Sequence, residues 1–64
     1  MTMVYFVATV SERVVVWSGP IEHVPHVDHF VTLNNEVYMV TALNWLLGDP
    51  SQQPELEIEL VKQQ

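Results

Sequence analysis

The stretch from Glu55 to Leu60 constrains the fold more than any other part of the chain, because acidic and aliphatic residues alternate in it without a break. Successive side chains of a β-strand point to opposite faces, so this pattern separates the carboxylates from the aliphatic side chains. We therefore predict a strand over residues 55–62. One face is expected to be buried, and the other carries Glu55, Glu57 and Glu59.

Other β-rich runs recur along the chain, and none shows a helical period. The further strands that we predict span residues 3–10, 13–18, 29–33 and 36–47. The first two form a hairpin around a short turn that begins at Ser11. Gly19-Pro20 is expected to end that hairpin, because proline has no N–H group for a sheet ladder.

The turns and bends of the second half can also be predicted. Asn34-Asn35 lies between two β-rich runs, and asparagine tolerates positive φ, so a type I′ hairpin turn is expected there. Residues 41–47 are compatible with either a short helix or a strand. We favour a long, bent strand with a bulge near Asn44, because so short an isolated helix is marginal.

Residues 1–64 are expected to form one small domain. A chain of this length buries only about 60% of the surface that its unfolded form exposes, and the absence of cysteine excludes disulfides. Five short strands in an open sheet would expose two edges. The predicted fold is therefore all-β, a small five-stranded SH3-like barrel or roll. An open meander that dimerises through an edge is the alternative.

Residues 24–45 contain a pattern of hairpin packing: a proline, a polar stretch, a strand, a turn, and then spaced aromatic and aliphatic side chains. The positions that carry it are Pro25, Asp28, Val31, Leu33, Tyr38, Val40 and Trp45. This pattern resembles small SH3-like β-barrel proteins of the kind often encoded by phages and prophages. Val27 departs from it, since a glycine is usual before the acidic residue. The resemblance implies a barrel fold and a binding module.

Charge restricts the possible partners. Eight acidic residues against two basic ones give a formal net charge of −6. Two cations cannot neutralise nucleic-acid phosphates, so direct nucleic-acid binding is not expected, and an anionic membrane is disfavoured for the same reason. The start of the chain does not resemble a signal peptide or a membrane span. We expect a cytoplasmic protein, in the host cytoplasm if it is phage-encoded.

Two sets of residues are candidates for a protein interface. The glutamates at 55, 57 and 59 lie about 7 Å apart along the strand, which suits a basic partner or mimics a row of phosphates; a charged strand that only prevents aggregation is the alternative. The second set consists of apolar side chains that should remain exposed, because the interior of one small barrel cannot bury all the apolar residues of its strands. Its members are Tyr5, Val7, Val15, Trp17, Val37 and Met39.

His23, His26 and His29 are the only histidines, and imidazole binds zinc, nickel or copper. Pro20 and Pro25 favour an extended segment, in which histidines three apart are separated by about 9 Å. They cannot all reach one ion in that geometry, although a turn near Pro25 would bring two together. We therefore predict no metal site and no cofactor. The histidines are interpreted instead as polar loop residues or as a pH-sensitive segment.

Catalysis has little support in the sequence. Ser11, Ser18 and Ser51 lie in or near turns, without a base and an orienting acid in a recognisable spacing. We therefore predict a non-enzymatic, acidic protein-interaction module, and the resemblance implies a phage-type accessory or inhibitory protein acting on a host protein. The alternatives are an oligomeric structural component of a virion or other assembly, and a histidine-based metal-binding domain.

Overall fold

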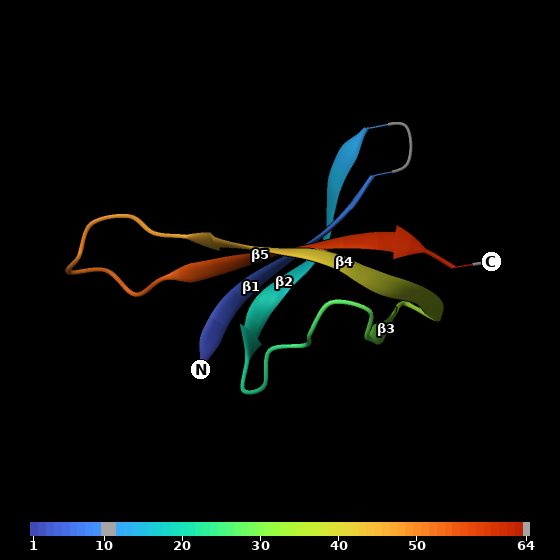
Figure 1. Ribbon diagram of the computed structural model, residues 1–64, viewed down its shortest axis with the longest axis horizontal. Coiled ribbons are helices and arrows are strands. Elements are labelled where there is room, and N and C mark those ends of the chain that lie inside the picture. The colour runs from blue at the N-terminus through green and yellow to red at the C-terminus, as the bar shows by residue number, and fades with distance from the viewer. Residues whose placement is uncertain (10–11, 64) are drawn as a thin grey trace.

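The computed structural model describes residues 1–9 and 12–63, and these form an all-β sheet that curls into a half-barrel (Figure 1). The described strands are β1 (Thr2–Thr9), β2 (Arg13–Ile21), β3 (Phe30–Leu33), β4 (Glu36–Leu46) and β5 (Glu55–Lys62). The predicted all-β fold class and its five strands are confirmed. The strand expected to reach Val10 and the turn expected at Ser11 lie partly outside the described residues.

The strand order in the sheet is β2-β1-β5-β4-β3. Hairpins join β1 to β2, β3 to β4, and β4 to β5, and all three pairs are antiparallel. β1 and β5 pair in parallel, which places the first and last strands side by side in the middle of the sheet. The outermost strands are therefore β2 and β3, and residues 22–29 connect them.

The hairpin between β3 and β4 has the turn that the sequence predicts. Asn34 and Asn35 have φ values of 52° and 67°, and Leu33 pairs with Glu36 across the turn. Positive φ at both central residues is the requirement of a type I′ turn, which matches the twist of the flanking strands. This prediction is confirmed.

Two predictions about β2 and β4 are wrong. β2 does not end at Gly19-Pro20 but continues to Ile21, with Pro20 opposite Met3. An edge strand has one side without a neighbour, so a residue that lacks an N–H is tolerated there. In β4 the bulge falls between Val40 and Ala42 instead of near Asn44, although the strand itself runs to Leu46 as expected.

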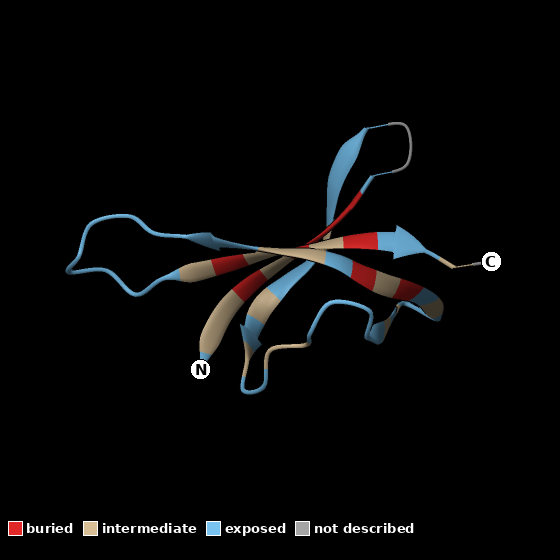
Figure 2. Cartoon of the chain, in the orientation of Figure 1, coloured by how far each residue is buried: buried red, intermediate tan, exposed pale blue. Residues whose placement is uncertain are grey.

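The hydrophobic core lies on one face of the sheet, which we call the inner face; the opposite one is the outer face. Figure 2 shows buried segments on the central strands β1 and β5 and on β4. The buried core cluster consists of Val4, Phe6, Ala8, Tyr38, Val40, Leu56, Ile58 and Leu60. Val24, from the segment between β2 and β3, packs against it. The core therefore leaves the outer face without a second layer.

Candidate binding surface

A column of glutamates occupies the middle of the outer face. Glu55, Glu57 and Glu59 alternate with the buried residues of β5, as the sequence predicts. On the β1 side the three glutamates pair in register with Met3, Tyr5 and Val7, and on the β4 side with Leu46, Asn44 and Ala42. The column is thus flanked on both sides by mainly apolar or uncharged residues.

The three carboxylates of the column have different surroundings. The Tyr5 hydroxyl donates a hydrogen bond to Glu55 Oε2 at 3.2 Å. Desolvation raises the pKa of Tyr5, and the nearby negative charge of Glu55 raises it further. Arg13 forms an ion pair with Glu57, whereas the Glu59 carboxylate has no hydrogen-bond or ion-pair partner among residues 1–9 and 12–63.

The six apolar residues expected to form one exposed patch do not lie together. Val15 is exposed on the outer face, but its neighbour Val7 is only 3% exposed, so the expectation that Val7 is exposed is wrong. Trp17 lies on the inner face, where its ring packs edge-on against Phe6 with centroids 5.6 Å apart. The cause is a bulge: Val16 is an extra residue between the pairs Phe6–Trp17 and Val7–Val15.

The remaining two members of that set belong to a separate apolar surface. Phe30, Met39 and Val61 pair in register across β3, β4 and β5, and Val37 lies two residues from Met39 on β4. Phe30 is 63% exposed, Val61 48% and Val37 41%. We call these four residues the β3-side row. Phe30 and Val61 were not predicted as members of an exposed surface, although counting back from the Asn34-Asn35 turn pairs Phe30 with Met39.

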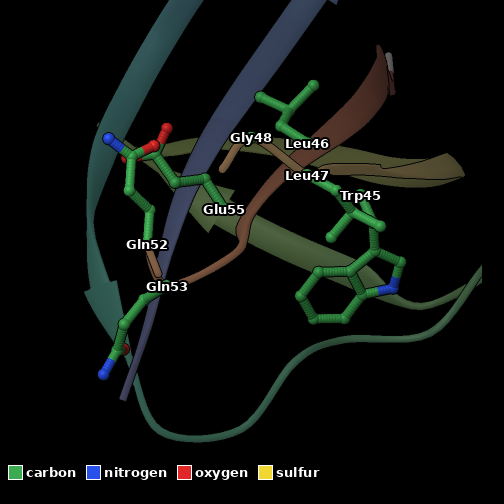
Figure 3. A pocket seen from close by; sticks show the side chains of 7 residues that line it. All are labelled: Trp45, Leu46, Leu47, Gly48, Gln52, Gln53 and Glu55. Atoms are coloured by element: carbon green, nitrogen blue, oxygen red, sulfur yellow. The ribbon is translucent and has the colours of Figure 1, made fainter. Parts of the chain in front are cut away.

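A hollow of about 590 Å³ lies where the β4–β5 hairpin opens into its loop (Figure 3). Trp45, Leu46 and Leu47 come from the end of β4 and its continuation, and Glu55 begins β5. Gly48, Gln52 and Gln53 complete the lining. In Figure 3 the Trp45 ring and the Glu55 side chain extend toward different sides of the hairpin.

The histidines lie in the segment that connects β2 and β3. The rings of His26 and His29 are in contact, with centroids 5.3 Å apart, and the backbone N–H of His26 donates to Nδ1 of His29 at 3.3 Å. The prediction of an extended segment between His26 and His29 is wrong, because Asp28 has a φ of 75° and the chain turns there. Within the described part of the chain, three or more metal-ligating side chains do not cluster at any point.

Two carboxylates outside the glutamate column, at the start of β4 and in the β4–β5 loop, also accept hydrogen bonds. Glu36 accepts hydrogen bonds from Lys62 Nζ at 3.2 Å and from the Tyr38 hydroxyl at 3.0 Å. These bonds lower the pKa of Glu36, that from Lys62 contributing most. In the β4–β5 loop, the backbone N–H and the hydroxyl of Ser51 both donate to Asp49 and lower the pKa of its carboxyl group. Asp49 and Ser51 thus stabilise a turn.

No protein-family model matches this chain, and neither a curated protein nor a solved structure matches it. The part of the chain that the structure describes contains no helix long and apolar enough to cross a membrane.

Proposed function

We propose that the protein is a non-enzymatic, acidic interaction module whose outer face binds a basic surface of another protein. The observation that carries this proposal is the glutamate column on β5. The column lies at the centre of the sheet. Within the described residues, Glu57 is the only one of its three glutamates that forms an ion pair. Glu55 and Glu59 form no ion pair within the described residues and can pair with a basic partner.

The composition of the column's surroundings supports a protein partner. Apolar and uncharged side chains of β1 and β4 flank the carboxylates, including Met3 and Leu46. A charged centre beside apolar contacts suits the mixed chemistry of protein interfaces. Complementary charge would accelerate association and select basic partners.

The class of partner follows from the resemblance to phage-encoded small barrels. An accessory or inhibitory protein that acts on a host protein in the host cytoplasm fits an acidic module of this size. A structural component of a virion or other assembly is the second candidate, favoured by the exposed β3-side row. An inhibitor is expected to bind as a monomer or dimer, whereas an assembly component is expected to form rings or larger oligomers, and light scattering after size exclusion distinguishes them.

The test is a titration of the isotope-labelled protein with an acetylated oligolysine peptide, followed by amide chemical shifts. We expect shifts at Tyr5 and along residues 55–59, with an affinity that falls as salt is added. The double variant Glu55→Gln/Glu59→Gln should weaken binding by about 2- to 30-fold, because exposed ion pairs contribute roughly 0.2–1 kcal/mol each.

The matched control is Glu12→Gln/Glu22→Gln. It removes two negative charges as well, but from exposed residues outside β5, and should bind the peptide nearly as well as the unmodified protein. Equal weakening by the two double variants would show that only net charge matters and would refute a specific surface. The same pair of variants, used as baits in a lysate of the native host, then separates partners of the glutamate column from general cation binders.

A further inference from the structure

The two edges of the sheet differ in their protection. An edge strand exposes unpaired backbone groups, which proteins guard with proline, charge or bulges. β2 has all three: Pro20, Arg13 and the bulge at Val16. Within Phe30–Leu33, β3 contains neither proline nor charge, and the one bulge on this edge in the described residues precedes it, where the Asp28 N–H and the His29 carbonyl both bond to Val40. β3 is therefore the less guarded edge, protected mainly by its short length of four residues.

The register identifies which backbone groups of β3 face outward. In a hairpin with a two-residue turn, the pair next to the turn, Leu33–Glu36, is hydrogen-bonded, and hydrogen-bonded pairs then alternate along the ladder. Val31 and His29 continue that series, and the bond from Val40 N–H to the His29 carbonyl, 2.8 Å, agrees with it. The N–H and C=O groups of Phe30 and Thr32 accordingly point away from β4.

These outward groups have no other partner in the described structure. The backbone hydrogen bonds outside the strand ladders, among residues 1–9 and 12–63, involve neither Phe30 nor Thr32. Both residues are also exposed. The edge therefore offers two donors and two acceptors in the spacing of an antiparallel ladder.

We propose that β3 pairs with β3 of a second copy of this chain, antiparallel, around a two-fold axis at Val31. In this register Phe30 lies opposite Thr32 of the second copy, and Thr32 lies opposite its Phe30. Each of these is a hydrogen-bonded pair, so all the outward groups of both residues are satisfied. Val31 meets Val31 of the second copy in the non-hydrogen-bonded position between them. The strand is thus complementary to itself.

The charges around this edge do not prevent a second copy from pairing there, in spite of the net charge of −6. β3 itself carries no ionised side chain. The carboxylate of the adjacent strand, Glu36, is paired with Lys62. The two copies of β4 would lie roughly 14 Å apart, three interstrand spacings, which exceeds the screening length of about 10 Å. The exposed Phe30 and Val61 and the half-buried Met39 of both copies then extend one apolar surface across the joined sheets.

The experiment measures the mass of the full chain by analytical ultracentrifugation between about 10 µM and 1 mM, the range for a small interface of this kind. We expect a monomer–dimer equilibrium. Thr32→Pro deletes an outward N–H while leaving the β3–β4 ladder intact, and it should raise the dissociation constant about 10- to 100-fold, since two hydrogen bonds per dimer are lost. Thr32→Val retains the N–H and should dimerise like the unmodified protein.

A charge variant and a measurement on the unmodified protein complete the test. Phe30→Lys should weaken the dimer, whereas Leu47→Lys, the same charge change at an exposed residue of the β4–β5 loop, should not. Independently of any variant, the amides of Phe30 and Thr32 should gain exchange protection with concentration. An isotope-filtered contact between the Val31 α-protons of two copies should also appear. A monomer throughout the range, or a dimer that Thr32→Pro leaves unchanged, overturns the proposal.

Discussion

Replacing Ile58 by valine tests whether the core is organised as the structure indicates. Ile58 lies near the middle of the central strand β5, opposite Phe6 on β1 and Leu43 on β4, and is fully buried. The substitution removes one methylene group from this position. Its transfer free energy is about 0.8 kcal/mol, and with the cavity left behind the expected loss in the free energy of unfolding is about 0.5–1.5 kcal/mol.

The measurement is urea and thermal unfolding followed by circular dichroism and tryptophan fluorescence. For a domain of this size, about 1 kcal/mol corresponds to a decrease in Tm of roughly 4–8 °C. Val61→Ala is the matched control, because Val61 lies on the same strand but is exposed on the outer face. It should change the free energy of unfolding by no more than about 0.5 kcal/mol. Equal losses for the two variants would refute the assignment of inner and outer faces.

Two further predictions concern the β3–β4 turn and the response to pH. Asn35→Gly should keep or increase stability, whereas Asn35→Val should lose about 1–2 kcal/mol in urea unfolding, because a β-branched residue is strained at a φ of 67°; equal stability of the two variants would contradict the turn type. The pKa of Glu36 lies below its ordinary value of 4.5, so its contribution is present above that pH and is lost as the pH falls through the lowered folded-state value. The urea concentration at the midpoint of unfolding should therefore decrease as the pH is lowered below 4.5. The decrease should be smaller in Lys62→Met, and an identical decrease would exclude the ion pair as its cause.

Local patterns in the sequence predicted much of the fold. Alternation in residues 55–60 determines which side of β5 is buried, because each side chain points opposite to its neighbours. The Asn34-Asn35 turn likewise fixes the register of β3 on β4, since the number of turn residues determines the pairing. In both cases the information lies within a few consecutive residues.

Other features depend on residues that are distant in the sequence and could not be predicted from local patterns. The strand through Pro20 is possible because β2 is an edge, and its position follows from the parallel pairing of β1 with β5. The bulge at Val16 also could not be predicted from an alternating pattern with a period of two. One extra residue there places Trp17 on the inner face and separates it from Val15. The predicted single apolar patch failed for this reason.

The distribution of charge on the outer face links the two proposed surfaces. Among the described residues, no second layer covers the outer face of the curled sheet, so the side chains there determine what the sheet contacts. Carboxylates occupy the centre of that face as far as Glu59, and they oppose nonspecific association of the exposed strands. Beyond Glu59 the outer positions become apolar, at Val61, Met39 and Phe30. In the proposed dimer, the copies would therefore meet on the β3 side, and the glutamate column of each copy would stay accessible to a basic partner.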